Sequence, residues 1–327
     1  GIMQQDLLRL HTSMRLSTPY NHEPDWVEKI LEPFAPVMAE VYLPMHILVT
    51  HTARPWHGPT SSKEYDQQVD ELARALAPHN VSLNFVANGL CPPPGELVAL
   101  ENEFLRLDER YPNSIFTIAD LETAVRVHRK RSSVDLQSST LSRVNGPMAA
   151  WYWKEFVGSK GVTIDRNINR RPEIIKAIRK LNLTVRMVLN DDCIPECPSA
   201  MNHLSDIRLA DELGMSRPNV DSLMECARCR PMIDSFKRSH YWIIAQKEIL
   251  PSHLPHLDGM VEQIKITGRC ASTNTIVDRM IRYGQMVSNT NSFYQEPPEA
   301  WDRIAGCDRV CEVCGWCQRN LQRQTSE

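Results

Sequence analysis

The chain has 327 residues, a formal net charge of -3 and 42% hydrophobic residues. This length can bury a large core, so the fold needs neither disulfides nor metals for its stability. The near-neutral charge excludes a global basic field for nucleic acid, although a local basic patch leaves RNA open as a partner. No run approaches the roughly 18 apolar residues of a membrane span, and the first residues lack the apolar core of a secretory signal. We therefore expect a cytoplasmic protein with no membrane span.

Short apolar runs alternate with amphipathic segments along the chain, which indicates repeated βα units and a parallel sheet. Seven runs are typical of strands, at residues 40–50, 81–89, 114–120, 134–140, 161–166, 183–191 and 261–269. About eight such units over this length favour an α/β fold of the TIM type, a (β/α)8 barrel that need not be regular. The eighth strand is expected within residues 199–260.

Three segments follow from this arrangement. Residues 1–39 form an N-terminal extension that wraps the bottom of the barrel or covers its top. Residues 40–290 form the barrel domain, and residues 291–327 form a cysteine-rich C-terminal tail. Aromatic residues gather at 149–156 and 240–246, where helical spacing favours core packing over stacking on a nucleobase.

Chemistry in a barrel of this type belongs at the carboxyl ends of the strands. Polar residues gather at those predicted ends: Asn84, Asn88, Ser138, Ser139, Thr140, Asp165, Arg166, Asn167, Asn190, Asp191, Asp192, Lys265 and Arg269. Turns favour Asn, Asp and Ser in any case, so the clustering is more informative than any one member. Asp165, Asp191 and His203 are candidate proton carriers, and Arg269 offers positive charge. His203 is equally well explained as a hydrogen-bonded helix residue.

The cysteines are distributed unevenly. One, Cys91, lies in the first half, and nine follow residue 190: Cys193, Cys197, Cys226, Cys229, Cys270, Cys307, Cys311, Cys314 and Cys317. A disulfide framework is typical of small secreted domains, and this chain is neither small nor visibly secreted. Reduced thiolates that bind a metal are the better interpretation.

The first cysteine pair, Cys193 and Cys197, leaves the sixth predicted strand where the barrel mouth should be. Cys226 and Cys229 form a Cys-x2-Cys pair, in which two sulfurs from one turn converge on a single metal. Together the two pairs supply four ligands. That set suits either zinc or a 4Fe-4S cluster.

The terminal group, Cys307, Cys311, Cys314 and Cys317, has the spacing Cys-x3-Cys-x2-Cys-x2-Cys. Zinc ribbons normally bring two pairs from separate loops, whereas a dense run is typical of ferredoxin-like ligation. The spacing therefore favours an iron–sulfur cluster over zinc, with disulfides or inert thiols as a third alternative. The first three cysteines also match the radical S-adenosylmethionine signature, but that signature sits near the start of a barrel.

Several longer stretches keep a characteristic order. They are "LQSSTLSRVNGPMAAWYW" (136–153), "GVTIDRNINRRPEIIKAI" (161–178), "NDDCIPECP" (190–198) and "VEQIKITGRCASTNTIVDRMIRYGQ" (261–285). In order and content they resemble the collagenase-like (U-type) peptidase family, over roughly residues 40–290. The family's Lys-Ile-Glu-Gly-Arg stretch corresponds here to residues 265–269, in which Thr267 replaces the glutamate.

The resemblance implies a 4Fe-4S cluster at the barrel mouth, because the family's oxygen-independent hydroxylases of ubiquinone biosynthesis and of RNA hold one. Carried over by position, its ligands are Cys193, Cys197, Cys226 and Cys229, with Cys270 as a substitute. The terminal run is not a general family feature, and it suggests a second cluster that passes electrons to the first.

The leading hypothesis is an iron–sulfur, oxygen-independent oxidoreductase, hydroxylase-like or related. Its substrate would be a small molecule, a peptide or RNA. An electron donor protein would supply electrons to the enzyme, and the enzyme could form an oligomer or heteromer. A peptidase, as the family label suggests, is the second hypothesis, although the chain lacks a His-Glu-x-x-His motif. A non-enzymatic electron-transfer or assembly protein is the third.

Overall fold

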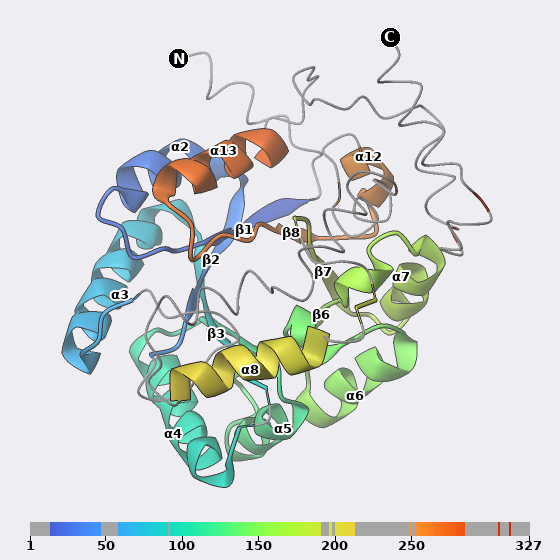
Figure 1. Cartoon of the computed structure of the whole chain (residues 1–327), viewed down its shortest axis with the longest axis horizontal. Helices are drawn as coiled ribbons and strands as arrows, with labels where there is room; N and C mark the ends of the chain where they lie inside the picture. The colour runs from blue at the N-terminus through green and yellow to red at the C-terminus, as the bar shows by residue number, and fades with distance from the viewer. Residues whose placement is uncertain are drawn as a thin grey trace.

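Eight parallel strands form a closed barrel in chain order (Figure 1). The computed structural model describes residues 14–46, 58–90, 92–190, 196–197, 200–212, 249, 253–284, 307 and 314. The strands are β1 (Arg15–Pro19), β2 (Met38–Pro44), β3 (Ser82–Ala87), β4 (Ile115–Ile118), β5 (Asp135–Ser138), β6 (Gly161–Thr163), β7 (Thr184–Val188) and β8 (Gln263–Lys265). This is the (β/α)8 architecture that the alternation of segments predicts.

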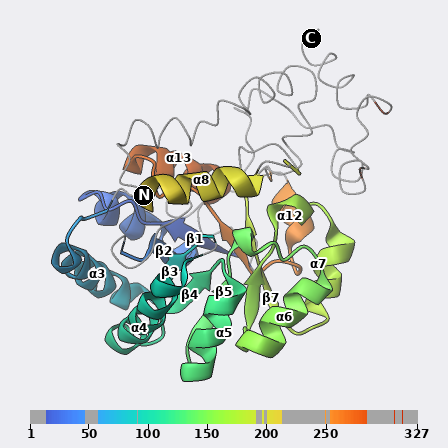
Figure 2. The same ribbon diagram turned by 60° about the horizontal axis from the view of Figure 1, so that its bottom comes forward.

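Helices surround the strands on the outside, as Figure 2 shows for α3 to α7. They are α3 (Ser62–Leu76), α4 (Pro94–Arg110), α5 (Leu121–Lys130), α6 (Pro147–Val157), α7 (Pro172–Arg179) and α13 (Thr273–Gly284), with the short α2 (Glu32–Phe34) and α12 (Leu254–Leu257). Short helical turns lie at Val27–Leu31, Ala35–Val37, Ala77–His79, Thr140–Ser142 and Arg166–Ile168. Among the helices described, none is long and apolar enough to cross a membrane.

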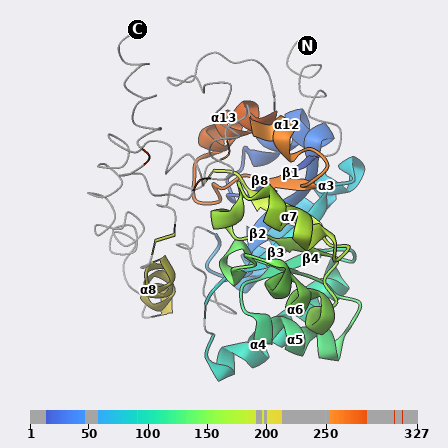
Figure 3. The ribbon, with the colours of Figure 1, turned by 90° about the vertical axis from the view of Figure 1, so that its right-hand side faces the viewer.

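Helix α8 (Ala200–Glu212) stands apart from this ring in side view (Figure 3). Its buried Arg208 forms an ion pair with Glu96 in the first turn of α4. Because α4 begins after the carboxyl end of β3, this ion pair ties α8 to the side of the barrel where the strands end.

Local signals in the sequence account for the helix starts. The side chain of Ser61 accepts a hydrogen bond from the Glu64 amide at the start of α3, and Asp120 does the same for Thr123 in α5. These caps satisfy backbone N–H groups that have no partner within the helix. Proline opens α4, α6 and α7, where a missing N–H does no harm.

All seven predicted strands are confirmed, but the predicted position of the eighth is wrong. The eighth strand is β1, which lies inside the expected N-terminal extension and not within residues 199–260. It pairs with both β2 and β8, and so closes the ring. With only five residues, of which Arg15, Ser17 and Thr18 are polar, β1 lacks the apolar run that marks the other strands.

Helix α6 departs from the expected core packing of its aromatic residues. Trp153 is buried as predicted, at 3% exposure, but Trp151, Tyr152 and Phe156 are exposed at 38%, 43% and 47%. The three exposed rings contact one another, with centroids 5.4 to 5.8 Å apart. The second aromatic stretch, 240–246, lies outside the described residues.

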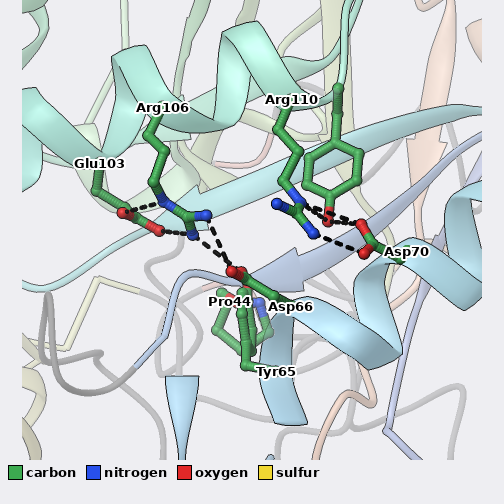
Figure 4. A network of polar contacts seen from close by, with 8 residues as sticks. Pro44, Tyr65, Asp66, Asp70, Glu103, Arg106 and Arg110 are labelled. Carbon is green, nitrogen blue, oxygen red and sulfur yellow. Dashed lines mark hydrogen bonds and ion pairs between the residues drawn. The ribbon is translucent and has the colours of Figure 1, made fainter. Parts of the chain in front are cut away.

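Ion pairs join α3 to α4 on the outer surface (Figure 4). The Arg106 guanidinium binds both oxygens of Asp66 at 2.9 and 3.0 Å, and Arg110 binds Asp70 at 2.6 Å. The Tyr111 hydroxyl also donates to Asp70. Because these side chains are partly in water, each pair contributes only about 0–1 kcal/mol, so the network orients the two helices more than it stabilises them.

Candidate functional site

The interior of the barrel is polar. Side chains alternate between the two faces of a strand, and the outward positions, such as Leu16, Val41, Phe85, Phe116 and Val185, are apolar and buried under the helices. The inward positions instead include Ser17, Glu40, Asn84, Thr117, Gln137, Arg186 and Lys265. Bulky branched apolar residues normally fill this space, so a polar filling indicates a functional constraint.

Glu40 is the centre of this interior network. Its carboxylate accepts hydrogen bonds from Ser17 Oγ at 2.6 Å and Asn84 Nδ2 at 3.0 Å. One guanidinium nitrogen of Arg186 lies 2.9 Å from one carboxylate oxygen and 2.8 Å from the other. Both charged side chains are almost fully buried. Removing one partner of such a pair typically costs about 3–5 kcal/mol, because the other is left charged and without compensation.

Lys265 lies beside this network. In the strand register it is opposite Ser17 of β1, which is in turn opposite Glu40 of β2. Its Nζ atom lies 4.0 Å from the centre of the Tyr42 ring, and the Tyr42 hydroxyl donates to the carbonyl oxygen of Ile266 at 2.6 Å. The pKa of Lys265 is lowered to about 7, chiefly by burial. Glu40 acts to raise it, and the charges of Arg269 and Arg186 act to lower it.

Two histidines follow β1 and β2 at the same end of the barrel. His22 Nδ1 lies 2.9 Å from Gln68 Oε1, and His46 Nε2 lies 3.1 Å from the carbonyl oxygen of Pro59. Burial lowers the pKa of both rings, so both are neutral near pH 7.

A cavity of about 450 Å³ opens between the loops after β5 and β6 and the first turns of α8. Its wall carries three arginines, Arg143, Arg166 and Arg171, and the thiol-bearing Cys197. Asp165 also lines it, where its carboxylate accepts a hydrogen bond from the Asn167 amide at 2.8 Å. We call this space the mouth pocket. Its three guanidinium groups suit an anionic ligand.

The described cysteines are Cys197, Cys270, Cys307 and Cys314, of which Cys197 and Cys314 carry free thiols. Arg171, on the wall of the mouth pocket with Cys197, donates a hydrogen bond of 2.7 Å to the carbonyl oxygen of Cys307. One residue of the terminal cysteine group is therefore held at the side of the barrel where the first cysteine pair leaves β7. Within the described part of the chain, no three His, Cys, Asp or Glu side chains are placed to hold one metal ion.

The predicted site residues divide into separate groups. Asp165 and Cys197 line the mouth pocket, whereas His203 is partly exposed on α8. Arg269 belongs instead with the interior network, since its charge acts on Lys265 and His22, and its guanidinium lies 3.4 Å from Asn88 Oδ1. The remaining candidates lie outside the described residues: Asp191, Cys193, Cys226, Cys229, Cys311 and Cys317.

Sequence reasoning missed Glu40, Tyr42 and Arg186 as site residues. Each lies within a strand, whereas the polar clusters that the sequence indicates lie at the strand ends. A signal was present, because the runs "MAEVYLP" and "TVRMV" place a charged residue between apolar neighbours. A charge at an inward strand position marks a polar barrel interior once the closed ring is known.

Comparison with solved structures finds the same barrel in the U32 peptidase Mk0906. The TM-score is 0.54 at 14% sequence identity, over 79% of this chain and 94% of that chain. A glycerophosphodiester phosphodiesterase from Parabacteroides distasonis covers 82% of this chain and 98% of its own, with a TM-score of 0.43 and 11% identity. No protein-family model matches the sequence, and neither does any curated protein.

The likeness to the U32 peptidase is a likeness of fold. It agrees with the resemblance to the collagenase-like peptidases that the motif order indicates. At this identity it does not carry over a reaction or a cofactor, so the chemistry has to be argued from the residues of this chain.

Proposed function

We propose that the protein is an iron–sulfur enzyme that carries out an oxygen-independent redox reaction at the carboxyl end of its barrel. The main support is the position of Cys197, a free and partly accessible thiol on the wall of the mouth pocket, among three arginines. The hydrogen bond from Arg171 to the Cys307 carbonyl is further support, because it holds the first cysteine of the terminal group at the same side.

The residues present fit such a cluster. Thiolates are the ligands of iron–sulfur clusters, and Cys197 would act with Cys193, Cys226 and Cys229, with Cys270 as a substitute. The terminal cysteines, Cys307, Cys311, Cys314 and Cys317, would hold a second cluster. Hydrogen bonds and positive charge around the sulfurs tune such a group, and Arg143, Arg166 and Arg171 are placed to supply them. When bound, the cluster would supply one-electron transfer.

The chain's own residues would bind and orient the substrate. The guanidinium groups of Arg143 and Arg166 would hold an anionic group of a small molecule, a peptide or RNA. Asp165 shapes the loop by its hydrogen bond to the Asn167 amide. An electron donor protein would be the partner, and the tail its docking segment.

Metal analysis after anaerobic purification tests the proposal. The intact chain should contain iron and acid-labile sulfide in equal amounts, about four of each per cluster. Cys197→Ala should lose the cluster at the barrel and Cys314→Ala the one in the tail, so that each variant keeps the iron of the other site. Cys91→Ala is the matched control, because this cysteine belongs to neither set and its loss should leave the iron content unchanged.

Two results would contradict the proposal. One is zinc without acid-labile sulfide, which would indicate structural thiolate sites. The other is an iron content that Cys197→Ala leaves intact.

A peptidase is the second candidate, and the shared fold with a U32 peptidase favours it. Of the described residues that line the mouth pocket, none is a histidine that could activate Cys197 as a nucleophile. Cleavage of a peptide library that persists after iron is removed would support this candidate against the redox enzyme.

A further inference from the structure

The mouth pocket has two chemically different walls. Its volume of about 450 Å³ lies within the range of roughly 300–1,000 Å³ that is typical of small-molecule sites. The loops after β5 and β6 contribute the three arginines and Asp165. The side chains that α8 contributes are apolar: Ala200, Met201 and Leu204. A ligand that fills the pocket therefore meets guanidinium groups on one side and hydrocarbon on the other.

The apolar wall is fixed at both ends of its helix. Before α8 begins, the Glu196 amide donates to Asn167 Oδ1 at 2.9 Å, in the turn after β6. Further along α8, the buried Arg208 forms its ion pair with Glu96 of α4. Leu204 lies between these two anchors and is 4% exposed. Because the wall is already ordered, a ligand that binds to it pays little conformational entropy.

Arg143 is the cation of the pocket that is best placed to meet a ligand. Its side chain is exposed, and in the part of the chain that the structure describes its guanidinium makes no hydrogen bond or ion pair. Its backbone is in the left-handed region at φ 57°, which favours glycine or asparagine. Asn80, Asn113 and Asn182 occupy this conformation at other turns. An arginine held in such a conformation commonly marks a functional site.

We infer that the mouth pocket binds an aliphatic compound with one acidic group, such as a medium-chain carboxylate. The Arg143 guanidinium would bind the acidic group, and the hydrocarbon chain would lie on Met201 and Leu204. This inference rests on the proposed function, because it names the class of substrate for that same site. Nucleobases normally stack on aromatic rings, and of the described residues that line the pocket none is aromatic.

Isothermal titration calorimetry with sodium octanoate tests the inference on the full chain. Octanol keeps the hydrocarbon chain but lacks the charge, and acetate keeps the charge but lacks the chain. Octanol should bind about tenfold more weakly than octanoate, because the charged hydrogen bonds to Arg143 are lost. Acetate should bind at least about a hundredfold more weakly, because each buried methylene group contributes to affinity.

Two pairs of variants locate the two halves of the ligand. Arg143→Gln should weaken octanoate binding about tenfold and leave octanol binding unchanged, whereas Arg129→Gln, at an exposed position of α5, should change neither. Ala200→Phe places a ring in the pocket and should abolish the binding of both compounds. Asn202→Phe places the same ring at an exposed position of α8 and should leave both unchanged.

Three results would overturn the inference. Octanoate that binds no better than octanol, or equally well to Arg143→Gln, would refute the role of the acidic group. Binding that Ala200→Phe leaves intact would place the ligand outside the mouth pocket. Adenosine monophosphate that binds more tightly than octanoate would assign the pocket to nucleotides.

Iron and sulfide measured on the same samples separate this inference from the proposed function. A chain that contains both but binds no octanoate would refute only the class of ligand. A chain that binds octanoate but contains zinc without sulfide would refute only the redox enzyme.

Discussion

At the scale of single residues, the barrel interior shows how burial changes the role of a charged side chain. Glu40 and Arg186 compensate each other at 2.8 to 2.9 Å, so both can remain charged without water. Among the described residues, Lys265 has only the face of an aromatic ring as a close partner, and a ring replaces water poorly. The same environment therefore holds one pair in its charged form and shifts the other cation toward neutrality.

This shift has a consequence for stability. The folded pKa of Lys265, about 7, lies below the ordinary value of 10.5, so the unfolded chain binds this proton more tightly. The resulting penalty on folding is largest below pH 7 and disappears as the pH rises toward 10.5. We expect Lys265→Met to raise the free energy of unfolding by about 4 kcal/mol at pH 7, and by progressively less at higher pH.

Urea unfolding at several pH values measures this effect. The pH dependence is the decisive quantity, because methionine also changes apolar packing by an amount that does not vary with pH. Lys160→Met, at an exposed position, should show no such dependence. A difference between Lys265→Met and the parent that stayed constant from pH 7 to pH 10 would refute the shift.

At the scale of elements, α6 carries apolar residues on two faces. The inner face packs Ala150, Trp153 and Val157 against the barrel. The outer face presents Trp151, Tyr152 and Phe156 to solvent as one cluster of rings. Helical spacing predicts that each set shares a face, but it does not say which face meets the sheet.

Two tryptophans of α6 therefore form a matched pair for mutation. Trp153→Ala should lower the free energy of unfolding by about 3–5 kcal/mol, because it leaves a cavity against the barrel. Trp151→Ala should change it by less than about 1 kcal/mol, since that ring already contacts water. Chemical denaturation measures both, and equal losses would show that the outer rings are covered in the folded protein.

At the scale of the whole molecule, the closure between β1 and β8 decides the fold. The Ile266 amide donates to Ser17 and the Arg15 amide to Glu262, each at 3.0 Å, so the first and last strands complete the ring. Loss of either strand would expose unpaired edges on both sides of the gap. Strands near the two ends of the described chain are therefore as essential as those in its middle.

Native-state hydrogen exchange can test this closure. The amides of Ile266 and Arg15 should exchange through the same global opening as those between β2 and β3, with free energies of opening that agree within about 1 kcal/mol. The urea dependence of their exchange should match that of global unfolding. Exchange of these two amides by a smaller opening that is insensitive to urea would indicate that the barrel opens there first.

The fold could be predicted from the sequence to a large extent. Seven strands lie where apolar runs predict them, because a buried strand of a parallel sheet is a local and nearly continuous apolar signal. The exception, β1, is short and half polar, and its place in the ring depends on pairing with strands distant in the sequence. Asp165 and Cys197 both line the mouth pocket for a local reason, since each follows a strand of the barrel, β6 or β7.

The sequence by itself determined the order of strands and helices, the class of barrel and the end at which its polar loops gather. Only the tertiary structure decided which side chains meet inside. Arg186 reaches Glu40 across 146 positions, and Tyr42 reaches Ile266 across 224. Such pairs depend on the register of eight strands and on the closure of the ring. No local pattern encodes them, and the interior network with its unpaired lysine could therefore be seen only after the barrel was assembled.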